Sequence, residues 1–164
     1  MSVVLRNAQR SVPLRRVPLR RAVCVLRAAL GASRFAVGVV CAGDPLMRRL
    51  NGAYRQRHEP TDVLSFPFHR LAPGQLPRPR CRDDYNLGDI FLGVELIHRQ
   101  CRDSGEDFGA VLAITAAHGL CHLLGYRHST PGEWRQMYEK EAEILEALSR
   151  ATGASLRPLT AGLF

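Results

Sequence analysis

The sequence predicts a single α+β domain in which about four strands form one mixed sheet that packs against helices. Two observations support this fold class. Short apolar runs alternate with amphipathic segments of helical period, and 46% of the 164 residues are hydrophobic, which is enough for one core. The domain is expected to span residues 1–150. The Gly- and Pro-containing tail, residues 151–164, is expected to pack loosely.

Four segments have the composition of strands. Residues 35–42 form a nearly continuous apolar run rich in valine, as expected for a buried strand. Pro67 limits the strand that begins at Val63, because proline has no N–H to donate to a sheet. The predicted strands are residues 2–7, 35–42, 63–66 and 87–94, and the Pro-rich residues 69–84 are predicted to form a surface loop.

Helices are predicted between and after these strands. Residues 20–31 are amphipathic and end at Gly31, while Asp44 is predicted to cap a helix with Pro45 at its first position. The side chains of this second helix expected to face the core are Leu46, Leu50 and Tyr54. The remaining predicted helices are residues 95–102, 108–124 and 131–150. The last of these is expected to place acids outward and to bury Trp134, Met137, Ile144 and Leu148.

The charge of the chain is uneven. The net charge is +8, and residues 1–57 contain twelve arginines but one acid, Asp44. Arginine binds phosphate through two parallel hydrogen bonds and stacks on bases, so this bias favours a polyanionic partner such as RNA. A solvated basic surface, or a compositional habit of the genome, is the alternative explanation.

Composition also bears on location. No apolar run approaches the roughly 18 residues of a membrane span, so no membrane association is expected. The five cysteines form no CxxC pair, which favours reduced thiols inside a cell. The Arg-rich N-terminus without acids is similar to a mitochondrial transit peptide, yet it also supplies a predicted strand and helix. We therefore expect a mitochondrial protein whose N-terminal segment is retained, with a cytoplasmic or nuclear location as the alternative.

The most informative stretch is HGLCHLLGYRH, residues 118–128. His118 and His122 are four residues apart, which places both imidazoles on one face of a helix. Gly125 tolerates the left-handed conformation that ends a helix, so the chain can reverse and bring His128 to the same point. Three protein ligands with one open position are typical of a catalytic zinc site. We predict one Zn²⁺ per chain at the end of this central helix, although imidazole also suits nickel, copper and iron.

The histidine spacing equals that of the metzincin proteases, in which a glutamate after the first histidine is the general base. Gly119 occupies that position here and has no titratable group, so peptide hydrolysis is disfavoured. Asp62 and Asp89 are candidates to orient a ligand histidine or a water, or to make strand-end hydrogen bonds. The residues expected to be structural or exposed are Ser65, Cys121, His58, His69 and His98.

Four motifs together resemble the YbeY family of metal-dependent endoribonucleases. The HGLCHLLGYRH stretch is similar to the family signature HGxxHLxGYxH. PTDVLSFPF (residues 60–68), LGDIFLG (residues 87–93) and LNGAYRQRH (residues 50–58) resemble the family's TDVLSFPF, LGDI and LN..YR segments in the same order. The Arg-rich N-terminus and the tail resemble a eukaryotic, organellar member. Arg127 stands where many bacterial members have an acid.

The resemblance implies a zinc-dependent endoribonuclease specific for single strands, acting in ribosomal RNA maturation and in ribosome assembly and quality control. It implies zinc ligands at His118, His122 and His128 and a catalytic arginine at Arg55. It also implies single-stranded or ribosomal RNA and a protein of the small-subunit platform as partners.

Further RNA contacts are expected from the basic N-terminal half. Within it, the candidate substrate-binding side chains are Arg48, Arg49 and Arg57. The alternatives are a non-catalytic ribosome assembly factor stabilised by its metal and a metzincin-like peptidase.

Overall fold

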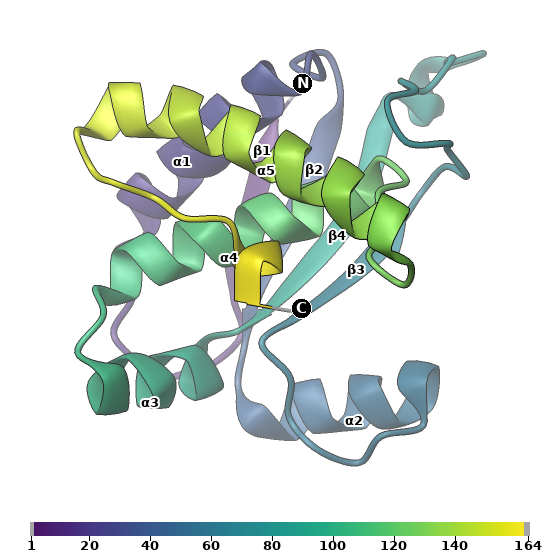
Figure 1. Cartoon of the computed structure of the whole chain (residues 1–164). Helices are drawn as coiled ribbons and strands as arrows, with labels where there is room; N and C mark the ends of the chain where they lie inside the picture. The colour runs from purple at the N-terminus through teal and green to yellow at the C-terminus, as the bar shows by residue number, and fades with distance from the viewer. Residues whose placement is uncertain (1, 163–164) are drawn as a thin grey trace.

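A four-stranded mixed sheet organises residues 2–162, which are those that the computed structural model describes (Figure 1). Its strands are β1 (Val3–Asn7), β2 (Ala36–Ala42), β3 (Val63–Pro67) and β4 (Asn86–Gly93). The order across the sheet is β1-β2-β4-β3, with β1, β2 and β4 parallel and β3 antiparallel to β4. The predicted α+β fold with one mixed sheet is confirmed, and β3 forms an edge of that sheet.

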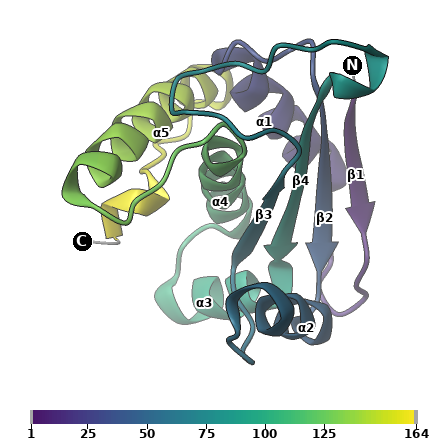
Figure 2. The same cartoon turned by 90° about the vertical axis from the view of Figure 1, so that its right-hand side faces the viewer.

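Two helices, α1 (Arg16–Ala29) and α4 (Phe108–Leu123), form a layer on one face of the sheet, and α5 (Pro131–Thr152) packs on both of them. α4 lies at the centre of this layer, with β3 and β4 on one side and α1 and α5 on the other (Figure 2). Because neighbours surround it, α4 is apolar around most of its circumference. α2 (Asp44–Arg55) and α3 (Val94–Ser104) lie at the end of the sheet where β2 and β4 finish.

Most buried side chains form one core between the sheet and this helical layer. Met137, Ile144 and Leu148 of α5 are buried there, as the helical period predicts. A second, smaller cluster of Ala42, Met47 and Leu64 has Phe66 and Phe91 packed against it. Through this cluster α2 is anchored at the edge formed by β3.

The start of α2 differs from the prediction. Its N-cap is Gly43, not Asp44, and the Asp44 N–H donates instead to the Glu95 carboxylate of α3 at 2.7 Å. The Asp44 carboxylate pairs with Arg99 at 2.6 Å. The cap is therefore supplied across space by another helix, which the local sequence pattern does not encode.

Tyr54, near the end of α2, is the second difference. It was expected to face the core, but its side chain is 68% exposed. The ring meets Phe66 of β3 edge to face, at 4.9 Å between centroids.

Both ends of the described chain belong to the fold. Val3 of β1 is buried and pairs with β2, so the Arg-rich N-terminal segment contributes a strand to the sheet. The expectation of a loosely packed tail is wrong for Leu159–Gly162, which form a 3₁₀ turn with Thr160 fully buried. This turn packs against α5 and α4, because Thr160 bonds to side chains of both helices. Within residues 2–162, no helix is long and apolar enough to cross a membrane.

Candidate metal centre and cleft

α4 carries two of the three histidines to one point. The Asp107 carboxylate caps its start by accepting from the Ala110 N–H at 2.8 Å. His118 and His122 follow on its last turns, one turn apart. The helix ends at Leu123 with Leu124 as its C-cap, and Gly125 then takes φ +89°, a left-handed conformation that reverses the chain. A Cβ at Gly125 would also overlap the Leu71 carbonyl. Both the backbone conformation and the lack of space therefore require glycine here.

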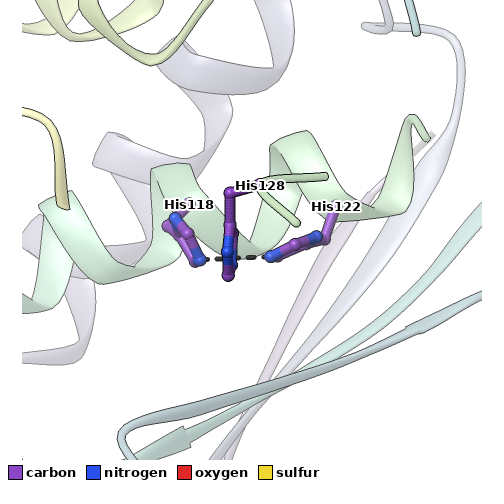
Figure 3. Close-up of side chains that lie close together, drawn as sticks. All are labelled: His118, His122 and His128. Carbon is purple, nitrogen blue, oxygen red and sulfur yellow. Dashed lines mark hydrogen bonds between the residues drawn. The ribbon is translucent and has the colours of Figure 1, made fainter. Parts of the chain in front are cut away.

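The reversal brings His128 beside the two helical histidines (Figure 3). One nitrogen from each ring lies within 4.8 Å of the others, which is compact enough to hold one metal ion. The Nε2 atoms of His118 and His122 are 3.1 Å apart. The structure therefore brings together all three predicted ligands, and among residues 2–162 they form the only such group of three or more metal-binding side chains.

Hydrogen bonds on the far side of two rings determine where their protons lie. The His118 Nδ1–H donates to the Glu141 carboxylate at 3.2 Å, and the His122 Nδ1–H donates to the Tyr126 carbonyl at 2.8 Å. Both partners only accept, so each neutral ring keeps its proton on Nδ1 and a lone pair on Nε2. Two lone pairs 3.1 Å apart repel unless a cation lies between them, and this arrangement fits a metal ion.

Glu141 is a functional residue that the sequence analysis missed. It lies on α5 with 0% exposure, and it also accepts from the N–H and the hydroxyl of Thr160. The Thr160 hydroxyl in turn lies 3.2 Å from His118 Nδ1. A sequence signal was present: Glu141 falls between Met137 and Ile144 on the buried stripe of α5, where a lone carboxylate needs a partner.

Burial favours the neutral form of His122 and His128 by lowering the pKa of each ring. Desolvation, followed by the positive charges of His118 and His128, lowers the pKa of His122 from 6.5 to about 3. Desolvation and the neighbouring His118 also lower the pKa of His128. The charge of Arg55 contributes to both shifts, which places its guanidinium within electrostatic reach of the cluster. Neutral imidazole is the form that binds a metal, so the site is prepared for an ion at neutral pH.

His118 and His122 line a cleft of about 760 Å³ that runs beside β3. Arg55 lines it from the end of α2, together with Arg70 and Arg127 from two loops. No aspartate or glutamate lines it, although the chain has fifteen acids. The cleft thus combines histidines that can bind a metal with three arginine side chains, and this combination suits a phosphate-containing substrate.

Several predicted residues lie outside the cleft. The exposed side chains Arg48, Arg49 and Arg57 are in or next to α2 but do not line it. Asp89 is exposed on the face of the sheet opposite α4, so it cannot orient a ligand histidine. Asp62 makes only a weak contact with Thr61, at 3.5 Å.

The remaining polar side chains have structural roles. The Ser65 hydroxyl donates to the Gly119 carbonyl at 3.0 Å, and Cys121 is buried in the core. His69 Nε2 lies 2.8 Å from the Asp84 carbonyl, and His98 packs on Phe108.

Gly119 faces the sheet and not the cleft. A Cβ there would lie 2.9 Å from Ile90 Cγ2 and 3.2 Å from Ser65 Oγ, so α4 can approach β3 and β4 only with glycine at this position. A glutamate, the base of the metzincin proteases, would not fit at this contact. The departure from the protease pattern is therefore steric as well as chemical.

Fold and site together define an α+β protein with a three-histidine metal-binding group in an arginine-lined cleft. The chain belongs to the YbeY endoribonuclease family, since residues 16–149 match the family model described as "Endoribonuclease YbeY". The motifs that predicted this family thus identified it correctly.

Curated relatives agree with the family model. "Endoribonuclease YbeY" of Homo sapiens is 53% identical over 165 residues, covering 100% of this chain and 98% of the relative. The protein of the same name from Anaeromyxobacter dehalogenans is 37% identical over 139 residues, covering 85% of this chain and 67% of the relative. A solution structure from Thermotoga maritima has a TM-score of 0.54 at 20% identity, covering 93% of this chain and 96% of that one, and it supports the fold alone.

Proposed function

We propose that this protein is a zinc-dependent endoribonuclease that cleaves single-stranded RNA during ribosomal RNA maturation and ribosome assembly. The observation that carries the proposal is the three-histidine group in a cleft with three arginines and no acid. The names of the curated relatives add support, because each is an endoribonuclease. Zinc is proposed because three neutral nitrogen ligands with an open fourth position suit a catalytic zinc ion.

The chemistry that zinc supplies at such a site is Lewis acidity, which polarises a phosphoryl oxygen and lets water ionise near neutral pH. The chain's own residues do the rest. His118, His122 and His128 would hold the ion, and Glu141 and the Tyr126 carbonyl keep two of the rings in the ligating tautomer. Arg55 is proposed to bind the scissile phosphate and to stabilise the charge that develops on it.

Two routes of attack fit this arrangement. In one, water attacks the phosphorus, the P–O bond to one ribose oxygen breaks, and that oxygen leaves as a hydroxyl. In the other, the 2′-hydroxyl of the RNA attacks the phosphorus, and the 5′-oxygen of the next nucleotide leaves as a hydroxyl. The second route leaves a 2′,3′-cyclic phosphate, so the termini of the products distinguish them.

The test compares cleavage of one RNA sequence, single-stranded and duplexed, by wild type, His122→Ala and Arg55→Glu, with zinc content and RNA binding measured alongside. We expect His122→Ala to lose zinc and cleavage together, and Arg55→Glu to lose about 10²–10³-fold in cleavage rate while retaining zinc. Arg135→Glu is the matched control, because this exposed α5 side chain undergoes the same charge change away from the cleft.

Two results would contradict the proposal: no cleavage by the wild type at stoichiometric zinc, or wild-type cleavage by Arg55→Glu. RNA binding without any cleavage would favour a non-catalytic ribosome assembly factor instead.

Partners and location are part of the same proposal. We propose ribosomal RNA and a small-subunit platform protein as partners, and mitochondria as the location. The proposed location rests on the Arg-rich N-terminus, of which residues 3–7 and 16–29 belong to the fold as β1 and α1. Import into isolated mitochondria without loss of these residues is the expected result, and co-purification with small subunits tests the partners.

A further inference from the structure

Two aromatic side chains that line the cleft are exposed to solvent. Residues 2–162 contain five exposed large hydrophobic side chains: Val4, Val17, Tyr54, Phe68 and Leu76. Only Tyr54 and Phe68 are aromatic, at 68% and 50% exposure, and of these five side chains only these two line the cleft that His118 and His122 also line. Exposed aromatic area within one cleft marks a binding surface more often than a packing defect.

The two rings are held in place from behind. Tyr54 meets Phe66 edge to face at 4.9 Å, and Phe66 meets Phe91 of β4 at 5.5 Å in the same way. Phe68 follows the end of β3 and meets the His69 ring at 5.0 Å. Each exposed ring therefore has a supported side and a free side, which lowers the entropy cost of receiving a flat ligand.

Charge in the cleft accompanies these rings. Tyr54 directly precedes Arg55, and Phe68 lies two residues before Arg70, so each aromatic ring has a cationic side chain next to it in the chain. Arginines that hold phosphates, interleaved with aromatic rings that hold bases, form the usual recognition surface for a single nucleic acid strand. A duplex cannot use such a surface, because its bases already stack on one another.

We propose that Tyr54 and Phe68 are stacking positions for two unpaired bases that flank the phosphate bound by Arg55. This inference rests on the proposed endoribonuclease function and specifies how the cleft selects single-stranded RNA. Stacking tolerates any base, so the selection is for an unpaired strand and not for a sequence.

The test uses the zinc-loaded full-length protein and a short single-stranded RNA with one mapped cut, together with the same RNA carrying abasic nucleotides on both sides of that cut. The variants are Tyr54→Leu, Phe68→Leu, Tyr54→Phe and Tyr138→Leu. Tyr138 is the matched control, since it stacks on Trp134 of α5 and does not line the cleft.

We expect each leucine variant in the cleft to raise KM about tenfold with a much smaller change in kcat, because stacking binds the flanking bases and not the reacting atoms. Tyr54→Phe keeps the ring and is expected to recover most of this loss. On RNA that is abasic on both sides of the cut, neither ring has a base to stack on, so wild type and leucine variants are expected to share one raised KM. The wild type then loses two stacks relative to intact RNA, and each leucine variant loses only the stack at its remaining ring.

Equal KM values for wild type and both leucine variants on intact RNA would overturn the inference. An equal loss by the variants on intact and abasic RNA would also overturn it, because the effect would then come from the fold. Comparing two RNAs within each protein keeps the test valid when a variant is less stable. Failure of the proposed function is distinguishable, since the wild type would then cleave neither RNA.

Discussion

Gly119 shows how one residue separates this site from a protease with the same histidine spacing. Its missing side chain lets α4 lie against Ile90 and Ser65, and a Cβ would have to displace both. The close approach of helix and sheet places His118 and His122 over the edge of β3. The position that holds the general base in the metzincin pattern is therefore a packing contact between helix and sheet in this protein.

The first prediction concerns this contact. Gly119→Ala is expected to lower the free energy of unfolding by about 1–2 kcal/mol, since overpacking costs more than the gain in helix propensity. Gly109→Ala, in the first turn of the same helix, is the control, because its Cβ would meet the nearest atom, Asp107 Oδ2, at an ordinary 3.5 Å. Urea denaturation of the metal-free proteins measures both. Equal effects at the two positions would show that Gly119 is not a packing requirement.

The second prediction concerns Glu141, the carboxylate behind His118. Glu141→Gln keeps the shape of the side chain but weakens its hold on the Nδ1 proton, so zinc affinity is expected to fall about 10–100-fold. Competition with a fluorescent chelator measures the affinity. Glu143→Gln, an exposed position on the same helix, is the control. An unchanged zinc affinity in Glu141→Gln would show that Glu141 does not contribute to metal binding.

At the scale of elements, the local pattern predicted most helices and strands but not the contacts between them. β1 to β4 and α4 follow the predicted segments closely, because apolar periodicity records which face of each element is buried. The cap of α2 was missed, since Glu95 and Asp44 are 51 residues apart in the chain. The last turn of the chain was missed for the same reason: its partner Glu141 lies on another element.

The third prediction concerns that last turn. Thr160→Val retains the size of the side chain and removes the hydroxyl that donates to Glu141, so a buried carboxylate loses a donor. We expect a loss of about 1–3 kcal/mol in the free energy of unfolding and a weaker zinc affinity. Thr152→Val is the control, because the Thr152 hydroxyl donates to the Leu148 carbonyl and accepts from the Ala154 N–H, and neither contact involves Glu141. If both variants retain wild-type zinc affinity, the turn does not support the metal centre.

At the scale of the whole molecule, the arginines that are concentrated in the N-terminal half of the chain are mostly not those that line the cleft. Residues 1–57 contain twelve arginines, yet only Arg55 among them lines the cleft. β1, which carries Arg6, is the edge strand opposite β3, so much of the basic N-terminal half lies away from the metal centre (Figure 2). The expectation that this half holds the flanking RNA is therefore not supported by its placement. Arg70 and Arg127, from the more acidic remainder, lie nearer the chemistry.

The fourth prediction is the pH dependence of the metal-free fold. Below pH 6.5 the unfolded chain protonates His122, whereas the folded protein keeps it neutral until about pH 3. The unfolded state then binds more protons, so stability falls as the pH drops through this window, by about 1.4 kcal/mol per pH unit from this group. Urea denaturation with a chelator between pH 7 and pH 4 measures the slope. His122→Gln should have a shallower slope; an equal one would contradict the lowered pKa.

The sequence by itself determined the three-histidine group and the family. Both depend on short-range spacing, with His118 and His122 one helical turn apart, followed by Gly125 and His128. Its strand and helix periods likewise determined the fold class. Only the tertiary structure decided that Glu141 and Thr160 lie behind His118. It also decided which side chains share the cleft with the histidines: Arg70, Arg127, Tyr54 and Phe68. These residues come from different elements, and they meet because α4 packs on the sheet and α5 packs on α4, which no local sequence pattern records.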